Sequence, residues 1–452
     1  MRTFKSTVLL FFIYHLKFTN ASFLEETYDV VDKHLSSRTP YRFKSYKNDS
    51  LVKYPNCKDF KIWMMIRHGA RLPKSKDILA ARNLIKLREE ILTKHNNRKG
   101  QLTKKQLQQF ENWTIDIPLE EEMFLALEGE DEMIMLAERM QNRFPNAIRQ
   151  KYHNKSFLFR YTGTQRTQQS ARYFSVGLFN KKNAQNVKFD PVMRVDKVLR
   201  FYKHCDRWQM QVKKNISSYK EQELYAKSRD MNNTLELVSK RLGLNRILDL
   251  DTVNNIYKLC GYETAWDKYK KSPWCYAFDE KTIEVLEYYH DLKLYWVDGY
   301  GYELTYRQAC VTMKDMFDTF RNERSPRATF FFSHSGTILK FLAYLGLYKP
   351  KTPLTGTHVV KNRNWRASDI DTFAANLAFV LFKCEDGDRV LTLHQEKIVR
   401  LPMCSQDLCP LHQLTEYFKD SIDNCDYDGM CNIPDKQDES LMNGRKELSI
   451  TV

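Results

Sequence analysis

Two arginines and a histidine stand close together in residues 67–73, in an order suited to phosphate chemistry. The segment reads Arg-His-Gly-Ala-Arg-Leu-Pro, and its polar members are Arg67, His68 and Arg71. An imidazole held near a phosphate can attack phosphorus and carry the phosphoryl group, which splits one difficult displacement into two easier ones. One guanidinium group can bind two phosphate oxygens at once, and it stabilises the charge of the transition state. The segment therefore predicts a phosphate site.

Two more candidate residues follow other short apolar runs. Arg166 comes soon after the run at 157–159, and His334 comes after the run at 328–332. Alone, each would be given a structural role. Ligands of open parallel sheets bind beyond the carboxyl ends of the strands, where helix N-termini add N–H groups and partial positive charge. Together with residues 67–71, these residues predict one phosphate site, in which arginines supply the charge and no metal or other cofactor is expected.

The elements that must position these groups can be read from the spacing of apolar residues. Short apolar runs predict buried strands, and apolar residues at helical spacing predict helices. We expect strands at 61–66, 157–159, 328–332, 374–384 and 389–393. We expect helices at 101–112, 119–144, 165–178, 283–296 and 337–347. The first three strands then each end just before a candidate site residue.

Residues 181–308 differ from the rest of the chain because they are polar, charged and helical in pattern. We expect an α-helical insertion or cap domain there, set into an α/β core that residues 22–180 and 309–432 form. Residues 1–21 are expected to be a signal peptide, and residues 433–452 a flexible tail. No apolar run reaches the roughly 20 residues that span a bilayer.

Several features predict export. Residues 1–21 combine early basic residues, an apolar stretch at 6–16 and small residues suited to cleavage after Ala21. The chain has 10 cysteines and no Cys-x-x-Cys pair, which favours disulfides in an oxidising compartment. Glycosylation sequons begin at Asn48, Asn112, Asn154, Asn215 and Asn232. The last residues match neither an ER-retrieval signal nor a GPI signal. We therefore expect a secreted glycoprotein.

The composition adds a strong basic balance. Lys and Arg number 72 against 56 Asp and Glu, which gives a net charge of +16. Such a charge favours anionic partners, although a well-solvated basic surface would give the same balance. We expect a polyanionic small-molecule substrate and no nucleic acid, and we leave open a peripheral association with an anionic surface. No oligomeric state is predicted.

Residues 67–73 resemble the signature of the histidine acid phosphatases, a branch of the histidine phosphatase superfamily. Further segments look like the multiple inositol polyphosphate phosphatases of that branch. They are Ser-Pro-Trp-Cys at 272–275, Val-Leu-Glu-Tyr at 285–288, Asp-Leu-Lys at 291–293, Gly-Tyr-Gly-Tyr at 299–302 and Ala-Asn-Leu-Ala-Phe-Val-Leu at 375–381. The resemblance covers roughly residues 50–431, and its combined motifs are more specific than the first segment alone.

The resemblance implies a histidine phosphatase-like α/β core with a mainly parallel sheet flanked by helices, plus a large inserted α-helical domain. It implies removal of phosphate from inositol hexakisphosphate and lower inositol phosphates, with 2,3-bisphosphoglycerate as a further candidate substrate. By motif position His68 is the nucleophile that forms a phosphohistidine, and His334 completes the catalytic pocket. The groups implied to bind the scissile phosphate are Arg67, Arg71 and Arg166.

The same resemblance implies three of the disulfides. The pairs are Cys57–Cys384, Cys260–Cys275 and Cys404–Cys409. It leaves four cysteines without assigned partners, namely Cys205, Cys310, Cys425 and Cys431.

One position departs from the family pattern. The second histidine of this subfamily normally opens a His-Ala-Glu motif whose glutamate protonates the leaving alkoxide, but residues 334–337 read His-Ser-Gly-Thr. Gly336 stands where the acid is expected. A general acid typically increases the reaction rate by about 10²–10⁴-fold. The hydroxyl of Ser335 has too high a pKa to replace it simply. An acid from elsewhere in the chain, a water or a neighbouring phosphate of the substrate could take over.

Two main hypotheses therefore stay open. In the first, the protein is a working inositol polyphosphate phosphatase with a displaced acid or a reduced rate. In the second, it is a catalytically weakened relative that binds inositol phosphates or sulfated glycans in a basic cleft. A broad acid phosphatase with other substrates is a third.

Overall fold

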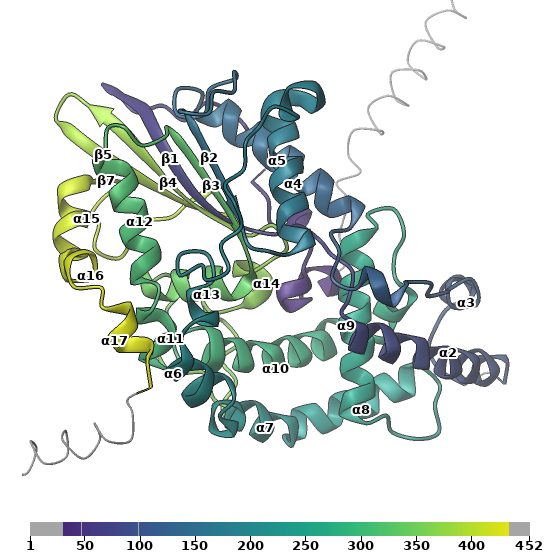
Figure 1. Ribbon diagram of the computed structural model, residues 1–452. Coiled ribbons are helices and arrows are strands. Elements are labelled where there is room, and N and C mark those ends of the chain that lie inside the picture. Colours follow the sequence, from purple (N-terminus) through teal and green to yellow (C-terminus); the bar gives the residue numbers. More distant parts are fainter. Residues whose placement is uncertain (1–29, 47, 98, 434–452) are drawn as a thin grey trace, which may run out of the picture.

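A seven-stranded sheet lies at the centre of the fold, in a computed structural model that describes residues 30–433 except 47 and 98 (Figure 1). The strands follow the order β2-β3-β1-β4-β5-β6, and β7 pairs with β5. Their bounds are β1 Cys57–Arg67, β2 Phe157–Tyr161, β3 Ala328–Ser333, β4 Asn376–Cys384, β5 Gly387–His394, β6 Lys397–Ile398 and β7 Leu408–Pro410. All five expected strands are present. The expected signal peptide lies outside the described residues, as does the expected tail apart from its first residue.

Helices cover the sheet and build a separate helical half beside it (Figure 1). The helices near the sheet are α4 Leu127–Arg143, α5 Gln165–Ala184, α12 Cys310–Arg321, α15 Leu411–Tyr417 and α16 Lys419–Asp423. α17 Tyr427–Cys431 lies farther from the sheet, on the side of the helical half. The helical half contains α2 Ser75–Asn96, α3 Lys104–Glu111, α6 Asp206–Trp208, α7 Lys220–Ala226, α8 Arg229–Arg241, α9 Leu250–Trp266, α10 Glu280–Asp298 and α11 Glu303–Arg307. Between the two halves lie α13 Ser335–Tyr344 and α14 Ala367–Ile370.

The sheet is mixed, so the expectation of a mainly parallel sheet is wrong. β2, β3 and β1 are parallel neighbours, whereas the pairs β1–β4, β4–β5, β5–β6 and β5–β7 are antiparallel. Parallel neighbours need a long crossover, and helical segments supply it among β1, β2 and β3. β4 and β5 are joined instead by a tight hairpin, in which Gly387 has a φ of 116°. The parallel part of the sheet is therefore confined to the three strands that end at candidate site residues.

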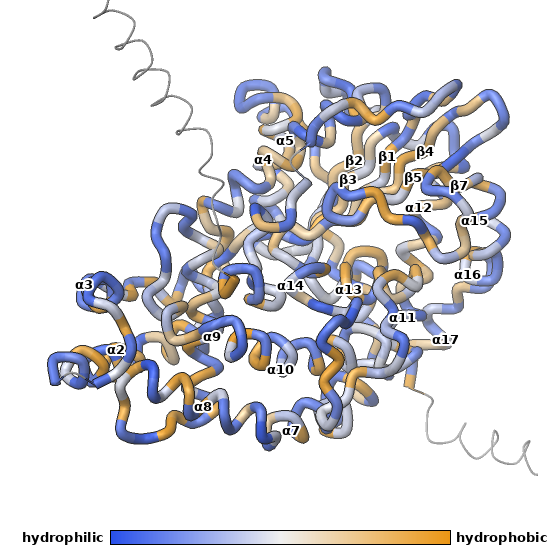
Figure 2. The backbone as a smooth tube through the Cα atoms, turned by 180° about the vertical axis from the view of Figure 1, so that it is seen from behind, coloured by the Kyte–Doolittle hydropathy of each residue, from blue (hydrophilic) through white to orange (hydrophobic). Residues whose placement is uncertain are grey.

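Alternate residues of β1 face two different cores. Trp63 and Met65 pack in the core that contains α12, α13 and the helical half, while Ile62, Met64 and Ile66 pack with α4 and α5. Successive side chains of a strand point to opposite faces, so a strand buried on both faces reads as one apolar run. Figure 2 shows the central strands largely in apolar colours, whereas outer helices such as α7 and α8 alternate between polar and apolar.

Several helices differ from the expectation, and α12, α14, α15, α16 and α17 match no helix expected from the sequence. α2 was not expected, although its buried residues recur three or four positions apart, as at Ile78, Ala81 and Leu84. α4 begins eight residues later than expected, because a 3-10 turn at Leu119–Glu121 and a positive φ at Met123 precede it. Every element between β2 and β3 is helical, as expected for residues 181–308. The division into core and inserted domain stays a prediction.

Five disulfides link distant parts of the chain. The three expected pairs are present, and Cys57–Cys384 joins the start of β1 to the end of β4. The cysteines without assigned partners form Cys205–Cys431 and Cys310–Cys425. Both of these bridges tie the C-terminal segment to helices of the chain's middle. The last described helix is therefore fixed covalently to the fold.

Replacing Cys57 and Cys384 with alanine should destabilise the protein more than replacing Cys404 and Cys409. In the chain-entropy model a bridge restricts the unfolded chain, and the effect grows with the number of residues enclosed. The first pair is 327 residues apart in sequence and the second pair 5. Loss of a native bridge typically lowers the free energy of unfolding by roughly 2–5 kcal/mol. We expect the first double variant to lie near the upper end, at about 5 kcal/mol. Thermal unfolding of both double variants measures this, and equal midpoints would contradict it.

Candidate active site

The candidate residues of all three strand-helix units meet at one edge of the sheet. β1, β3 and β2 lie side by side and end at Arg67, Ser333 and Tyr161. His68 and His334 follow two of these strands, and their ring centroids are 5.5 Å apart. Both imidazoles are buried, and the His68 backbone N–H donates to the Ser333 carbonyl at 3.1 Å. The structure thus brings together groups that are far apart in the sequence.

His68 is held with one ring nitrogen free. Its Nδ1 lies 2.9 Å from the Gly69 carbonyl oxygen, so Nδ1 carries the proton and Nε2 keeps its lone pair. The ring packs against Phe373 at a centroid distance of 6.2 Å. Burial, followed by the charges of Arg166 and Arg67, holds the pKa of His68 well below its usual value. The imidazole is therefore neutral, which is the state that a nucleophile needs.

The turn after His68 requires glycine. A Cβ at Gly69 would lie 2.4 Å from the Gly129 carbonyl oxygen, and one at Gly129 would lie 2.3 Å from that of Ala70. The turn and α4 therefore touch backbone to backbone. Further along α4, the buried carboxylate of Glu132 accepts from the Ala70 N–H at 2.7 Å and from the Tyr41 N–H at 3.1 Å. These contacts of α4 fix the turn that orients the imidazole.

Backbone carbonyls anchor Arg67. Its Nη1 donates to the carbonyl oxygens of Asp371 at 2.6 Å and Thr372 at 2.9 Å. The guanidinium lies 4.7 Å from the ring centroid of Phe373. Within the described part of the chain, Nε of Arg67 has no hydrogen-bond partner. The segment that follows α14 therefore positions Arg67 and leaves part of its guanidinium available.

Arg71 and Arg166 reach the same place from other elements. The Arg71 guanidinium lies over the ring of Tyr262 in α9, 5.4 Å from its centroid. Arg166, in the first turn of α5, places Nη2 3.4 Å from Nδ1 of His334, whose Nε2 lies 2.9 Å from the Thr162 hydroxyl. Burial, followed by the charge of Arg71, lowers the pKa of Arg166 to about 10. Each of the predicted arginines thus lies close to a histidine of the site or to another of the arginines.

Arg200 is a site residue that the sequence did not reveal. Burial, followed by the charges of Arg166 and Arg200, holds the pKa of His334 well below its usual value. Nε of Arg200 and Nε of Arg166 are buried, and neither has a hydrogen-bond partner among the residues that the structure describes. Arg200 lies within residues 181–308, in a stretch that carries no motif, so no local signal could have found it.

Gly336, where the family pattern has an acid, lies next to a carboxylate from another helix. α13 begins one residue before Gly336, so this position is in the first helical turn. A Cβ there would lie 3.2 Å from Cζ of Tyr202 and 3.5 Å from Oδ1 of Asp298. Asp298 ends α10 and pairs with Nζ of Lys340 in α13 at 2.5 Å. No motif marks Asp298 or Lys340, and sequence reasoning missed both.

The electrostatics of the site suit an anion. α5 and α13 both begin at the ends of loops that follow site strands, so their N-termini add partial positive charge to that of the arginines. Among the described residues, no three His, Cys, Asp or Glu side chains gather as a metal site would require. The arrangement can hold a phosphate group against the free nitrogen of His68.

Gly69→Ala should disable the site and also lower the thermal stability of the protein. The added methyl group would press on the Gly129 carbonyl and shift the turn that aims His68, so we expect the rate of phosphate-ester hydrolysis to fall at least about 10²-fold, the effect of a misplacement of about 1 Å. Gly163→Ala is the matched control, because a Cβ there meets only the tip of the exposed Val192 side chain at 3.0 Å. Hydrolysis assays with thermal unfolding compare the two. Equal activities in both variants would contradict this account of the turn.

Comparison with known proteins identifies the family of the chain. The sequence matches the family model of the histidine phosphatase superfamily (branch 2) over residues 61–402. It is 30% identical over 417 residues to multiple inositol polyphosphate phosphatase 1 of Drosophila melanogaster, covering 89% of this chain and 88% of that protein.

Two solved structures are similar in fold. A phytase from D. castellii superposes with a TM-score of 0.70 at 15% identity, covering 90% of this chain and 88% of that one. A multiple inositol polyphosphate phosphatase of Bifidobacterium longum, in complex with inositol hexasulfate, superposes with a TM-score of 0.60 at 16% identity. The match covers 82% of this chain and 94% of that one. The chain therefore belongs to the histidine phosphatase superfamily (branch 2), among the multiple inositol polyphosphate phosphatases, and is a histidine-type phosphatase.

Proposed function

We propose that this phosphatase hydrolyses inositol polyphosphates, from inositol hexakisphosphate downwards, through a phosphohistidine at His68. One observation carries the proposal. A buried, neutral imidazole with a free Nε2 lies among arginines whose buried Nε atoms have no hydrogen-bond partner among the described residues. The relative from Drosophila bears the name of this activity, and the Bifidobacterium relative binds an inositol hexasulfate, which supports the same class of ligand.

The residue roles follow from the positions of the groups. Nε2 of His68 attacks phosphorus while Nδ1 keeps its proton on the neighbouring carbonyl. Arg67, Arg71 and Arg166 bind the phosphoryl oxygens and stabilise their growing charge. His334 lines the same pocket beside Arg166. Water then attacks the phosphohistidine and releases inorganic phosphate.

Two partly buried lysines that are repelled by other cations support a substrate with several phosphate groups. Burial, followed by the charge of Lys213, lowers the pKa of Lys293 in α10, and Arg38 adds to the effect. Burial, followed by the charges of Arg200 and Lys213, lowers the pKa of Lys203. These cations repel one another, and a polyanionic ligand relieves the repulsion. An inositol polyphosphate meets this requirement best, and 2,3-bisphosphoglycerate, with two phosphate groups, is a second candidate.

A binding protein without turnover is the alternative. Such a protein needs the cations but has no need for an imidazole with a free nitrogen. The hydrogen bond that leaves Nε2 of His68 free therefore favours turnover, whereas Gly336 at the expected acid position favours binding alone. The comparison of catalysis with binding in one variant separates the two.

His68→Ala should abolish catalysis and leave binding largely intact. The variant lacks the nucleophile, so we expect phosphate release from inositol hexakisphosphate to fall at least about 10³-fold. Binding of inositol hexasulfate should persist because the arginines supply most of the charge. A quench in alkali, where phosphohistidine survives, should trap the labelled intermediate in the unchanged protein only.

His412→Ala, at an exposed residue of α15, is the control and should keep full activity. Turnover at the normal rate by His68→Ala would exclude the mechanism. Tight binding of inositol hexasulfate with no turnover by the unchanged protein would establish the binding alternative.

The proposal includes export through the secretory pathway to the extracellular space. All ten cysteines are paired, which an oxidising compartment favours. The asparagines of the five sequons named above are exposed, so a glycosyltransferase can reach them. Within the described residues, no helix has the length and apolar character needed to cross a membrane.

Expression of the full chain in a eukaryotic secretory host should deliver it to the medium as a glycoprotein. The secreted form should begin at Ser22, because the signal peptide is expected to be cleaved after Ala21. N-terminal sequencing checks the cleavage, and peptide N-glycosidase F should reduce the mass. Asn154→Gln should remove one glycan. Protein that stays inside the cells with an intact N-terminus and no glycan would contradict the proposal.

A further inference from the structure

In the family pattern, an acid at position 336 protonates the leaving group. Gly336 has no side chain that could donate this proton. We propose that Ser335 and Asp371 form a proton-donating pair, in which the Ser335 hydroxyl protonates the leaving oxygen and Asp371 restores the proton to Ser335. The proposal rests on the phosphohistidine mechanism proposed above and names the groups that complete its first step.

The two side chains are in direct contact at the edge of the phosphate site. Ser335 begins α13 directly after His334, and its Oγ lies 2.5 Å from Oδ2 of Asp371. Oδ1 of the same carboxyl lies 3.4 Å from Nη1 of Arg67. Asp371 is completely buried while Ser335 is partly exposed, so a ligand can reach the hydroxyl and not the carboxyl. The pair thus connects Arg67, which is proposed to bind the phosphate, to the first turn of α13, where the family pattern has an acid.

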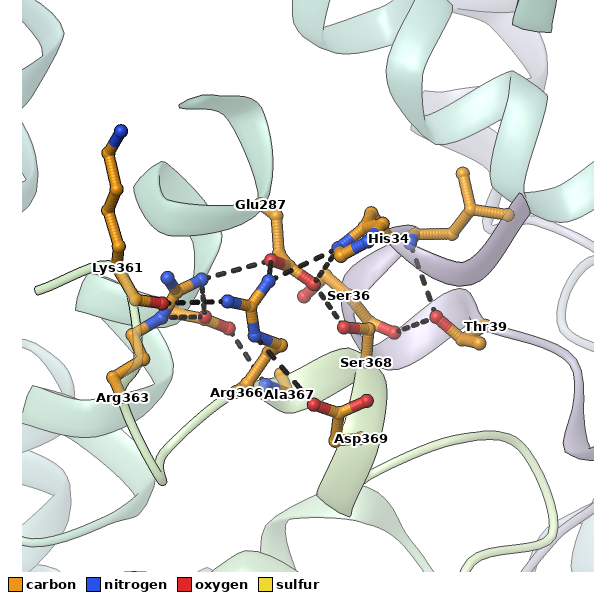
Figure 3. Close-up of polar contacts among 12 residues, drawn as sticks. His34, Ser36, Thr39, Glu287, Lys361, Arg363, Arg366, Ala367, Ser368 and Asp369 are labelled. Carbon is orange, nitrogen blue, oxygen red and sulfur yellow. Dashed lines mark hydrogen bonds and ion pairs between the residues drawn. The ribbon is translucent and has the colours of Figure 1, made fainter. Parts of the chain in front are cut away.

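A buried polar network holds the chain segment that leads to Asp371, and Figure 3 shows this network around Glu287. Glu287 and Asp291 of α10 are fully buried carboxylates. They accept hydrogen bonds from the segment that forms α14, namely from Arg363, Arg366, the N–H of Ala367 and the hydroxyl of Ser368. Asp371 caps the C-terminus of α14, where its N–H donates to the Ala367 carbonyl. The network therefore fixes the backbone from which the Asp371 carboxyl reaches Ser335.

Backbone carbonyls hold Arg67 at shorter distances than the Asp371 carboxyl does. The backbone carbonyls of Asp371 and Thr372 lie 2.6 and 2.9 Å from Nη1, closer than the carboxylate at 3.4 Å. Oδ1 of Asp371 has no hydrogen-bond partner among the described residues. Burial of a polar group that is only partly paired costs free energy. The carboxyl thus gives Arg67 a counter-charge at 3.4 Å, and proton supply to Ser335 gives the same carboxyl a second role.

Asp298 is nearer to position 336 but is unsuited to donate a proton. Its Oδ1 pairs with the buried ammonium of Lys340 at 2.5 Å. Burial opposes ionisation of this carboxyl, yet the charges of Lys340 and Lys213 lower the pKa of Asp298 below its usual value. A general acid must carry its proton before the reaction, and an ion-paired carboxylate carries none.

The proton transfers of the pair balance over the two chemical steps. In the first step the bond from Nε2 of His68 to phosphorus forms and the phosphorus–oxygen bond of the ester breaks. The Ser335 proton passes to the leaving oxygen and the Asp371 proton passes to Ser335, which leaves Asp371 ionised. In the second step water attacks phosphorus, the bond to Nε2 breaks, and the proton lost by water returns through Ser335 to Asp371.

The charges around Asp371 set the pH range in which the pair can work. The groups that face it are Arg67 from β1, Asp298 from the end of α10 and Lys340 from α13. Burial raises the pKa of Asp371 to about 6, and Asp298 adds to this effect, while Arg67, the hydrogen bond with Ser335 and Lys340 oppose it. The carboxyl is protonated below that pH and ionised above it. The hydrolysis of esters with poor leaving groups should therefore slow as the pH rises through about 6.

The test compares Ser335→Ala, Asp371→Asn and the double variant with the unchanged protein. Inositol hexakisphosphate and glycerol phosphate have alkoxide leaving groups that need a proton, whereas 4-nitrophenyl phosphate needs little protonation. We expect kcat on the two alkyl esters to fall about 10²-fold in each variant, and kcat on the nitrophenyl ester to change less than about threefold. The double variant should lose no more than each single variant, because the two residues act as one unit.

The pH profile gives a readout that a structural role would not change. In Asp371→Asn the alkyl-ester rate should no longer fall as the pH rises through about 6. The substrate phosphates titrate in the same range, but they do so equally in both proteins. Inhibition by inorganic phosphate should be unchanged, which reports that the arginines still bind. A profile identical to that of the unchanged protein would overturn the role of Asp371.

Asp298→Asn is the matched control when it is assayed well below pH 6, where Asp371 keeps its proton with or without the charge of Asp298. It removes the other nearby carboxylate and should then affect all three esters alike. Equal losses on alkyl and nitrophenyl esters in Ser335→Ala and Asp371→Asn, or unchanged rates, would overturn the pair. So would a selective loss on alkyl esters in Asp298→Asn. If Asp371→Asn fails to fold, the ratio measured for Ser335→Ala decides. An active His68→Ala would refute the mechanism itself, whereas an inactive one without selectivity in the Ser335 variant would refute only the pair.

Discussion

Buried positive charge is the constraint on which the rest of the structure depends. Arginines from β1, α5 and the loop before α6 surround two neutral imidazoles, and both desolvation and mutual repulsion oppose this arrangement. The fold holds the cations mainly with backbone carbonyls and aromatic faces. Carbonyls of residues 371 and 372 and the ring of Phe373 hold Arg67, and the ring of Tyr262 lies under Arg71. Such partners stabilise a guanidinium without a negative charge that would compete with a phosphate, and the Asp371 carboxyl, 3.4 Å from Nη1 of Arg67, adds one counter-charge at a longer distance.

Buried carboxylates perform a different task in this protein, because they fix backbone. Glu132 holds the turn after β1, and Glu287 and Asp291 hold the segment around α14. Each carboxylate comes from a helix that lies outside the segment it holds. The position of the nucleophile and of its first arginine therefore depends on helices from both halves of the molecule. This dependence explains why the site sits between the sheet and the helical half, where α13 and α14 also lie (Figure 1).

Phosphate binding and leaving-group protonation are supplied by separate parts of the fold. The strand ends and helix N-termini of the parallel strands provide the cations, and these depend on the order β2-β3-β1. The carboxyls near Gly336 come instead from the end of α10 and from the segment before β4. The helix that carries His334 can therefore lose its own acid without disturbing the phosphate pocket. An acid from a different segment then needs only to reach the first turn of α13.

Local patterns in the sequence determined much of this protein. The apolar runs predicted all five strands tested, residues 67–73 located the first group of site residues, and the family resemblance predicted three disulfides. These features are local or motif-bound: a strand buried on both faces must be apolar throughout, and the turn at Gly69 tolerates no side chain. The helical spacing of α2 was present in the sequence as well and was overlooked.

Only the tertiary structure decided the rest. It made the sheet mixed, joined Cys205 to Cys431, and brought Arg200 beside His334. It also placed Asp371 against Ser335, 36 residues away in the sequence, and Asp298 against Lys340, 42 residues away. No motif can report such pairs, because each partner has an ordinary local sequence. Their meeting depends on the path of the whole chain, which the packing of two cores on the faces of β1 determines.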